Sequence, residues 1–204
     1  MRNVADRPDP GMPAGLGPAP DGLTLRSLAQ PSADGRAAAR RFCLDTIREF
    51  YGTEYRPDWH ADLDSLLSAP EQCWFSPENR GAFWSLSAPD GDIVATAGLY
   101  RLNWKPNLVA AFADRYPLAE EVTQLVRVYV RRDLRGRGIG RWLSALAEAE
   151  AQRQGFPTLY LHANTDTTAT MSFWRAQGFD PFAAADGTTH FDKRLVETSR
   201  VGSQ

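Results

Sequence analysis

The sequence predicts an α/β fold of the α+β kind in a single domain. Alternating or β-branched apolar runs indicate strands, and segments with apolar residues at helical spacing lie between them. The resulting order is βααββ, then βαβα, then ββ, without an internal repeat. The chain has 204 residues, of which 43% are hydrophobic and 24% charged. That length and composition are enough to bury a core without disulfides or a structural metal.

Composition also divides the chain into three parts. Residues 1–22 are rich in Pro, Gly, Ala and Asp, and too few apolar side chains are present to offset the entropy of ordering them. We therefore expect a flexible leader over 1–22, one folded domain over 23–197, and a short tail over 198–204.

The first half of the domain is predicted to hold three strands and two helices. Leu23–Leu28 alternates apolar and polar residues, as in a strand. Ser32 or Asp34 can cap the following helix, whose apolar side includes Cys43. Pro89–Asp92 is a strong hairpin signal. The expected elements are a strand at 23–28, helices from 34 to 50 and from 58 to 67, and a hairpin of strands at 83–88 and 93–99.

The second half begins with a long polar connection and then alternates strands and helices. The connection, 101–120, lacks a clean period, and connections of that length are usually functional or mobile. Gly178 is the kind of residue that ends a helix in a left-handed turn. The expected elements are strands at 125–130, 158–163 and 189–196, with helices at 141–154 and 167–177.

The most informative motif is the stretch RGRGIGR at residues 135–141, between the strand at 125–130 and the next helix. The first turn of a helix has N–H groups without an intrahelical partner, and the helix dipole adds positive charge there. Alternating glycines remove side chains that would hold an anion away, and three arginines add charge. The motif therefore predicts a binding site for a pyrophosphate.

Two common nucleotide motifs do not fit this loop. A nucleotide-triphosphate loop needs Gly-Lys-Ser/Thr, and no Lys follows these glycines; the third Gly of a dinucleotide fingerprint would fall on Arg141. The pattern that fits is Arg-x-x-Gly-x-Gly, carried by Arg135, Gly138 and Gly140. It resembles the acyl-CoA loop of the GNAT superfamily, the Gcn5-related N-acetyltransferases. The alternative for the isolated motif is a basic Gly-rich turn on an RNA-binding or solvated surface.

Two further stretches strengthen the resemblance, which covers residues 23–196. Arg127–Val130 precedes the loop, and Phe173–Phe179 is similar to the family's Phe-Tyr-x-x-x-Gly-Phe. The resemblance implies a mixed, mostly antiparallel sheet of six to seven strands flanked by about four helices. It also implies acetyl-CoA as acyl donor, without a metal.

In the resembled fold the central strand splays from its neighbour and receives the pantetheine arm, while the loop amides hold the pyrophosphate. Asn164 could bond the pantetheine or a water, or could simply occupy a strand-to-helix turn. The cofactor-binding residues that the resemblance implies are Val128, Tyr129, Val130, Arg135, Gly136, Arg137, Gly138, Ile139, Gly140, Arg141, Asn164 and Trp174.

The usual acid and base of the family do not carry over. Many members have an Asn that begins the later helix and, seven residues further on, a Tyr that acts as general acid. In this chain Thr167 replaces the Asn and Trp174 replaces the Tyr. An indole has no transferable proton at neutral pH. Some members place a Glu base three residues before the Arg of the central strand, where this chain has Gln124.

The catalytic residue is therefore unknown from sequence. Keeping a lysine-type amine neutral at pH 7 costs about 4.6 kcal/mol, which calls for a base. Glu121, with its neighbour Glu120, and His162 are candidates, as is Asp166. The alternatives are solvated glutamates, a structural histidine and a helix cap, and a weakly basic amine would need no strong base.

The acceptor site in the resembled fold lies among residues 50–60 and 104–116. Five aromatic side chains in these segments could line a pocket, or could equally serve as core or dimer contacts. They are Tyr51, Tyr55, Trp59, Trp104 and Tyr116.

Bulk properties exclude several classes of partner and site. The net charge of −2 gives no general attraction to nucleic acid. No apolar run approaches about 18 residues, so no membrane span is expected. No apolar stretch follows Arg2 as in a secretory signal, and Cys43 and Cys73 are too few for a disulfide framework, so a reducing cytoplasm is expected.

The sequence thus predicts a cytoplasmic, acetyl-CoA-dependent N-acetyltransferase that acts on a small-molecule or peptide amine in a ternary complex, with no covalent acyl-enzyme. The rival interpretation is a non-catalytic acyl-CoA-binding or interaction module on the same fold. A third is an RNA-binding loop, whose affinity would fall steeply with salt. The oligomeric state stays open, a homodimer included.

Overall fold

The computed structural model describes residues 16–27, 33–164 and 168–195. Its strands form one seven-stranded sheet in the order β1-β2-β3-β4-β5-β7-β6. The β4–β5 pair is parallel and the other neighbouring pairs are antiparallel. The strands are β1 (Thr24–Ser27), β2 (Ala82–Ser87), β3 (Ile93–Arg101), β4 (Val122–Val130), β5 (Thr158–Asn164), β6 (Asp180–Ala185) and β7 (Thr188–Arg194). The predicted mixed, mostly antiparallel sheet is confirmed.

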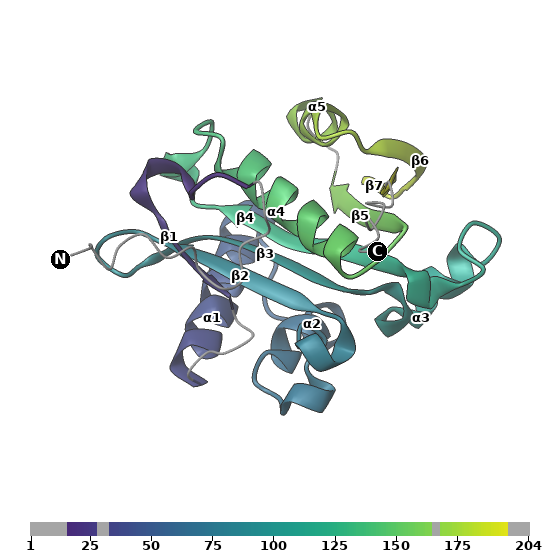
Figure 1. Ribbon diagram of the computed structural model, residues 1–204, viewed down its shortest axis with the longest axis horizontal. Helices are drawn as coiled ribbons and strands as arrows, with labels where there is room; N and C mark the ends of the chain where they lie inside the picture. The colour runs from purple at the N-terminus through teal and green to yellow at the C-terminus, as the bar shows by residue number, and fades with distance from the viewer. Residues whose placement is uncertain (1–15, 28–32, 165–167, 196–204) are drawn as a thin grey trace, which may run out of the picture.

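Helices cover both faces of this sheet (Figure 1). α1 (Ala33–Tyr51) and α2 (Pro57–Ser65) lie on one face. α4 (Ile139–Arg153) lies on the other, and the core beneath it also takes up Trp174 of α5 (Thr168–Ala176). A short helix, α3 (Pro106–Ala111), lies at one end of the sheet. No described helix is long and apolar enough to cross a lipid bilayer.

Alternation along the strands sends side chains into separate cores on the two faces. Leu125 and Leu159 pack under α4, whereas Phe83 and Tyr100 pack against α1 and α2. Cys43 is fully buried in the second core, as predicted, and burial raises the pKa of its thiol to about 12. A thiol held in that form is a small apolar side chain and not a nucleophile.

A β-bulge interrupts the pairing of β3 with β4. Thr96 lies opposite Tyr129, but Gly98 lies opposite Val126, so β4 has one extra residue between them. Arg127 occupies the bulge with φ +53°, and its carbonyl accepts a hydrogen bond from Thr96 Oγ1 at 2.9 Å. A bulge bends its strand and increases the twist.

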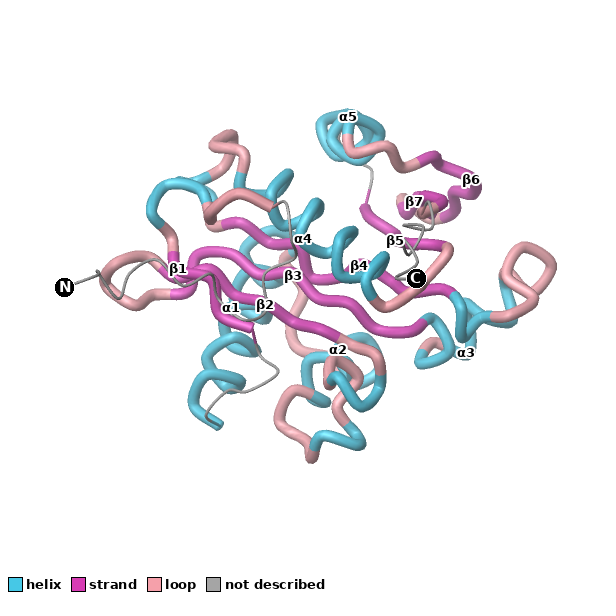
Figure 2. Tube along the Cα trace, in the orientation of Figure 1, coloured by secondary structure: helices cyan, strands magenta, loops and turns pink. Residues whose placement is uncertain are grey.

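β4 and β5 separate after Gln124, just before the bulge (Figure 2). They pair only over Val122–Gln124 with Thr158–Tyr160, although β4 continues to Val130 and β5 to Asn164. β4 stays paired with β3, and β5 stays paired with β7. The facing edges of β4 and β5 are therefore left without a strand partner in the described part of the chain, as the family resemblance implied.

The predicted leader ends too late. Leu16 and Ala19 pack against the core under α4, and Trp142 Nε1 donates to the carbonyl of Gly17 at 2.9 Å. Residues 16–22 are thus part of the fold, because α4 supplies the apolar partners that their own composition lacks. Residues 1–15 and the predicted tail, 198–204, lie outside the described residues.

The polar connection over 101–120 and the start of the central strand also differ from the prediction. The connection includes α3, after which Phe112 packs with Leu108 and Val109 in a third, small core. β4 begins at Val122, three residues before the predicted start, because the buried polar residues Thr123 and Gln124 break the apolar run on which the prediction rested.

Candidate functional site

The glycine loop leads into α4 as an open cradle of backbone. Gly136 and Gly138 have φ of +77° and +82°, and a Cβ added at either would meet no atom within 4 Å. The positive φ angles therefore favour glycine at these two positions, and close packing does not. The open space beside them leaves room for an anion. Gly138 is the N-cap of α4, and within the described ranges no side chain caps the first turn. Its N–H groups are available to an anion.

The predicted arginines surround the loop in different ways. Arg135 donates from Nε to the carbonyl of Val130 at 3.2 Å and stacks its guanidinium 3.7 Å from the ring centroid of Phe50, so it also fixes the loop to α1. Arg137 lies 3.7 Å from Asp21. Arg141 is exposed on the first turn of α4.

Two neighbours of these arginines have packing roles. Ile139 is buried and anchors the first turn in the core. An added Cβ at Gly140 would lie 3.4 Å from the Phe173 ring, so this side of α4 faces α5 at ordinary contact distance.

The separated end of β4 leads from this loop toward the middle of the sheet. Val128 and Val130 are half-buried against the core under α4, whereas Tyr129 faces α1 and α2. Asn164 is exposed at the end of β5. Trp174 is 8% exposed and meets Phe179 edge-to-face in the core. We therefore leave Trp174 out of the proposed cofactor contacts.

Four polar side chains meet where β4 and β5 begin to separate. Gln124 Nε2 lies 3.1 Å from His162 Nδ1. The hydroxyl of Tyr160 lies 2.7 Å from His190 Nδ1 and 3.4 Å from His162 Nδ1. Gln124 is 1% exposed, and its Oε1 is buried without a partner among the described residues. An unmet buried acceptor is costly, so a ligand or a water is expected to satisfy it.

His162 is neutral in this cluster at pH 7. The residue as a whole is exposed, but protein encloses its ring. This desolvation, together with the charges of His190, Lys105 and Arg127, lowers the pKa of His162 to about 4. A Gln124 amide that donates to Nδ1 places the ring proton on Nε2. Rotating the amide would place that proton on Nδ1, facing Gln124 Oε1, and would leave Nε2 as the acceptor.

Acidification is expected to destabilise the protein progressively from pH 6.5 down to about 4. Desolvation lowers the pKa of His60, His162 and His190 in the folded state. Below pH 6.5 the unfolded chain therefore binds protons that the folded chain does not. The free energy of unfolding consequently decreases as the pH is lowered. Urea denaturation at pH 7 and pH 5 checks this, and His162→Asn should flatten the dependence. Equal stability at both pH values would contradict the described environments.

A buried ion pair ties α2 to the bulge of β4. Arg127 donates from Nη2 to Asp62 Oδ1 at 2.6 Å and from Nε to Oδ2 at 2.8 Å. Burial alone would raise the pKa of Asp62, but the charge and hydrogen bonds of Arg127 outweigh it and hold that pKa below its usual value. Arg127 also donates to the carbonyl of Trp59 at 3.2 Å. The wall of the opening on the α2 side is thus fixed to the strand that forms its edge.

The predicted acceptor-side aromatics do not gather in one pocket. Tyr51, Tyr55 and Trp59 are exposed, whereas Trp104 is half-buried and Tyr116 is buried. Trp104 stacks on Trp74 at 5.3 Å between ring centroids. Tyr116 donates to Asp192 at 2.8 Å.

The other predicted bases that the structure describes lie outside the Gln124–His162 cluster. Glu120 and Glu121 are exposed and precede the end of β4 that is still paired with β5. Glu121 lines a separate hollow with Arg115 and Arg194. Asp166 and Thr167 lie outside the described residues.

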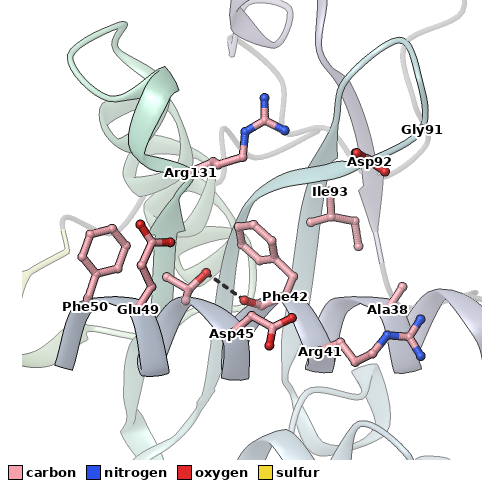
Figure 3. A pocket seen from close by; sticks show the side chains of 11 residues that line it. Ala38, Arg41, Phe42, Asp45, Glu49, Phe50, Gly91, Asp92, Ile93 and Arg131 are labelled. Carbon is pink, nitrogen blue, oxygen red and sulfur yellow. Dashed lines mark hydrogen bonds between the residues drawn. The ribbon is translucent and has the colours of Figure 1, made fainter. Parts of the chain in front are cut away.

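A second groove lies between α1 and the β2–β3 turn (Figure 3). Its volume is about 430 Å³, and Arg41, Asp45, Glu49, Asp92 and Arg131 give it mixed charge. Phe50, which also contacts Arg135, lines it, and no sequence motif marks it.

Comparison with known proteins identifies the family. The profile of the Acetyltransferase (GNAT) family matches residues 44–179, about two thirds of the chain. The chain belongs to the GNAT acetyltransferase family. GNAT acetyltransferases use acetyl-CoA as acyl donor, and the family's fold agrees with the sheet, the opening and the glycine loop described above.

Two curated relatives are mycothiol acetyltransferases. That of Jonesia denitrificans is 25% identical over 122 residues, 60% of this chain and 33% of its own length. That of Corynebacterium urealyticum is 24% identical over 126 residues, 59% of this chain and 36% of its own. This chain therefore spans about a third of the length of the curated relatives it matches.

Solved GNAT-family structures share the fold at low sequence identity. An acetyltransferase from Staphylococcus aureus Mu50 has a TM-score of 0.62 at 16% identity, covering 85% of this chain and 100% of its own. The PaiA N-acetyltransferase of Thermoplasma acidophilum, solved in complex with coenzyme A, has a TM-score of 0.58 at 13% identity, with 85% and 99% covered.

Sequence reasoning found part of this site. It named the glycine loop, Gln124 and His162, but not Lys105 or the fully buried Asp62, which holds Arg127 of β4. The pair Asp62–Arg127 joins residues 65 positions apart, so no local pattern marks it.

Proposed function

We propose that this GNAT acetyltransferase transfers the acetyl group of acetyl-CoA to a primary amine by direct attack in a ternary complex. One observation carries the proposal: the opening between β4 and β5 runs from the Gln124–His162 cluster toward the uncapped first turn of α4. Backbone donors for a diphosphate and for a pantetheine amide thus lie along one path. The acceptor would be a small-molecule or peptide amine.

The cofactor would be held mainly by backbone. The amides of residues 136–141 would bind the diphosphate, with Arg137 and Arg141 adding charge. The unpaired edge of Val128–Val130 would hydrogen-bond the pantetheine as an added strand, as peptides bind to a sheet edge. Its N–H groups would also polarise the thioester carbonyl, whose oxygen gains charge in the transition state.

Positioning would supply much of the rate enhancement. Holding an amine in line with a thioester can contribute up to about 7–11 kcal/mol. The attacking nitrogen must then lose a proton, and we propose that Nδ1 of His162 accepts it. The Gln124 amide, which donates to Nδ1 beforehand, then turns its Oε1 toward the new N–H. A group with so low a pKa is a weak base toward a free ammonium. It can still take a proton from the far more acidic nitrogen formed once the C–N bond has been made. Trp174 cannot protonate the leaving thiolate.

His162→Asn is expected to lower kcat by roughly 100-fold, the scale of one general base. The affinity for CoA should stay the same, because the cofactor contacts are backbone contacts on β4 and α4. Steady-state kinetics and calorimetry on one preparation separate the two effects. An unchanged kcat would show that water, and not His162, takes the proton.

A second candidate is a non-catalytic acyl-CoA-binding module. It is favoured by Gln124 and Trp174, which stand where many family members carry their base and acid. Release of free thiol from acetyl-CoA with a panel of primary amines separates the candidates. We expect amine-dependent release with at least one class. CoA binding without any release over a broad panel would overturn the enzymatic proposal.

A further inference from the structure

Lys105 is an unpaired cation beside the proposed acceptor opening. It lies between the end of β3 and α3, and its side chain is half-buried. Its Nζ lies 5.0 Å from the ring centroid of Trp74, which itself stacks on Trp104. The ammonium forms no hydrogen bond or ion pair with another described residue, whereas the backbone of Lys105 is bonded to Leu102, Leu108 and Val109. An ammonium group taken partly out of water without a counter-charge is costly, and burial accordingly lowers its pKa.

The other lysine of the chain shows the contrast. The sequence has 23 basic residues, and all but Lys105 and Lys193 are arginines. Lys193 is also half-buried, but it donates to Glu148 at 2.6 Å and to the carbonyl of Gln177 at 3.0 Å. The ammonium of Lys193 thus has a carboxylate partner, and the ammonium of Lys105 has none among the described residues.

The charges around Lys105 do not balance it. Its Nζ lies over the Trp74 ring, Trp74 meets Tyr100 edge-on at 5.2 Å between ring centroids, and Tyr100 pairs with Gln124 across β3 and β4. Asp62 of α2, Arg127 of β4 and His162 of β5 are its charged or titratable neighbours there. Asp62 already forms two hydrogen bonds with Arg127, so the charge of Arg127 balances the charge of Asp62. The opening thus has a surplus positive charge at a point within electrostatic reach of the Gln124–His162 cluster.

The same opening has an unmet hydrogen-bond acceptor. Gln124 Oε1 is buried without a partner in the described ranges, while Nε2 of the same amide lies against His162. A primary amine has N–H groups that can donate to this oxygen. One molecule with an amine and a nearby anion would satisfy both Gln124 Oε1 and Lys105.

We propose that the acceptor amine carries an anionic group, a carboxylate or a phosphate-like group, and that Lys105 binds this group while Gln124 Oε1 receives an N–H of the amine. The inference rests on the proposed acetyl transfer and narrows its substrate class. Lys105 is then a specificity-determining residue.

The test uses amines in matched sets on the full-length chain. Each set holds an α- or ω-amino acid, its carboxamide and its aminoalkylphosphonate at equal spacer length. Rates of thiol release are compared as kcat/KM per unprotonated amine, because the members of a set differ in amine pKa. We expect the best anionic member to exceed its carboxamide by about 100-fold, the scale of one buried charge pair. Comparing carboxylate with phosphonate identifies the anion.

Lys105→Met should abolish this preference by lowering only the anionic rates, and Lys105→Arg should restore part of it. Arg48→Met, which removes an exposed cation paired with Asp45 on α1, should leave the preference intact. CoA affinity and the thermal melting curve show whether each variant is folded. Calorimetric binding of the N-acetylated carboxylate and carboxamide in the presence of CoA reports the Lys105 contact without turnover.

Three results overturn the inference in distinguishable ways. If the wild type acetylates carboxamides as well as carboxylates, the proposed transfer stands and the anion contact is wrong. If Lys105→Met lowers both rates equally, Lys105 has a structural role. If no amine releases thiol and neither N-acetyl compound binds, the proposed function fails together with the inference.

Discussion

Gly138→Asp is expected to weaken CoA binding by at least 100-fold, or about 2.7 kcal/mol, while the protein stays folded. The carboxylate would stand at the N-cap of α4, where its oxygen can accept from the same N–H groups that a diphosphate needs. It would also repel the ligand's charge. A Cβ added at this position meets no neighbour within 4 Å, so the substitution begins in open space. Calorimetric titration with CoA measures the loss.

Gly155→Asp is the matched control. Gly155 follows the other end of α4, has φ of +76°, and would also place its Cβ in open space. Both variants therefore carry the same backbone strain from an L-residue in a left-handed conformation. Gly155→Asp should bind CoA like the wild type. Equal losses in the two variants would attribute the effect to strain and not to the cradle.

Asp62→Ala is expected to lower the free energy of unfolding by about 3–5 kcal/mol. The substitution leaves the Arg127 guanidinium, whose side chain is 15% exposed, without its fully buried counter-charge. It also removes the tie between α2 and the bulge of β4, so acetyl transfer should fall even where the variant is folded. Urea denaturation followed by circular dichroism measures the first effect, and thiol release the second.

The control for Asp62→Ala is a solvent-exposed ion pair between the same two types of residue. Asp45 and Arg48 are paired at 2.8 Å with side chains 65% and 60% exposed. Asp45→Ala should change the free energy of unfolding by less than about 1 kcal/mol. If Asp62→Ala costs no more than Asp45→Ala, the buried pair does not hold the α2 wall in place.

The parts of the site that follow local rules could be predicted from the sequence. Alternating glycines between a β-branched strand and an amphipathic helix specify their own backbone geometry, so the left-handed conformations of Gly136 and Gly138 follow from the sequence. The cofactor contacts of this loop stay a prediction. The hairpin around Pro89–Asp92 and the end of α5 before Gly178 are local in the same way. The family resemblance then supplied the separation of β4 from β5, which no single segment specifies.

The rest depends on residues far apart in the chain. Lys105 is an ordinary polar residue in a connection without periodicity, and only the tertiary fold places it near His162 and Asp62. Residues 16–22 are ordered by contacts with Trp142, more than 100 positions away. Trp174 occupies the family's tyrosine position by sequence, but packing, which sequence spacing does not report, places it in the core.

A crystal structure of the complex with CoA tests the central claim most directly. The account predicts the diphosphate within hydrogen-bond distance of the backbone amides between Gly136 and Arg141, and the pantetheine alongside Val128–Val130. A diphosphate bound in the groove between α1 and the β2–β3 turn, with the first turn of α4 free of ligand, would contradict it.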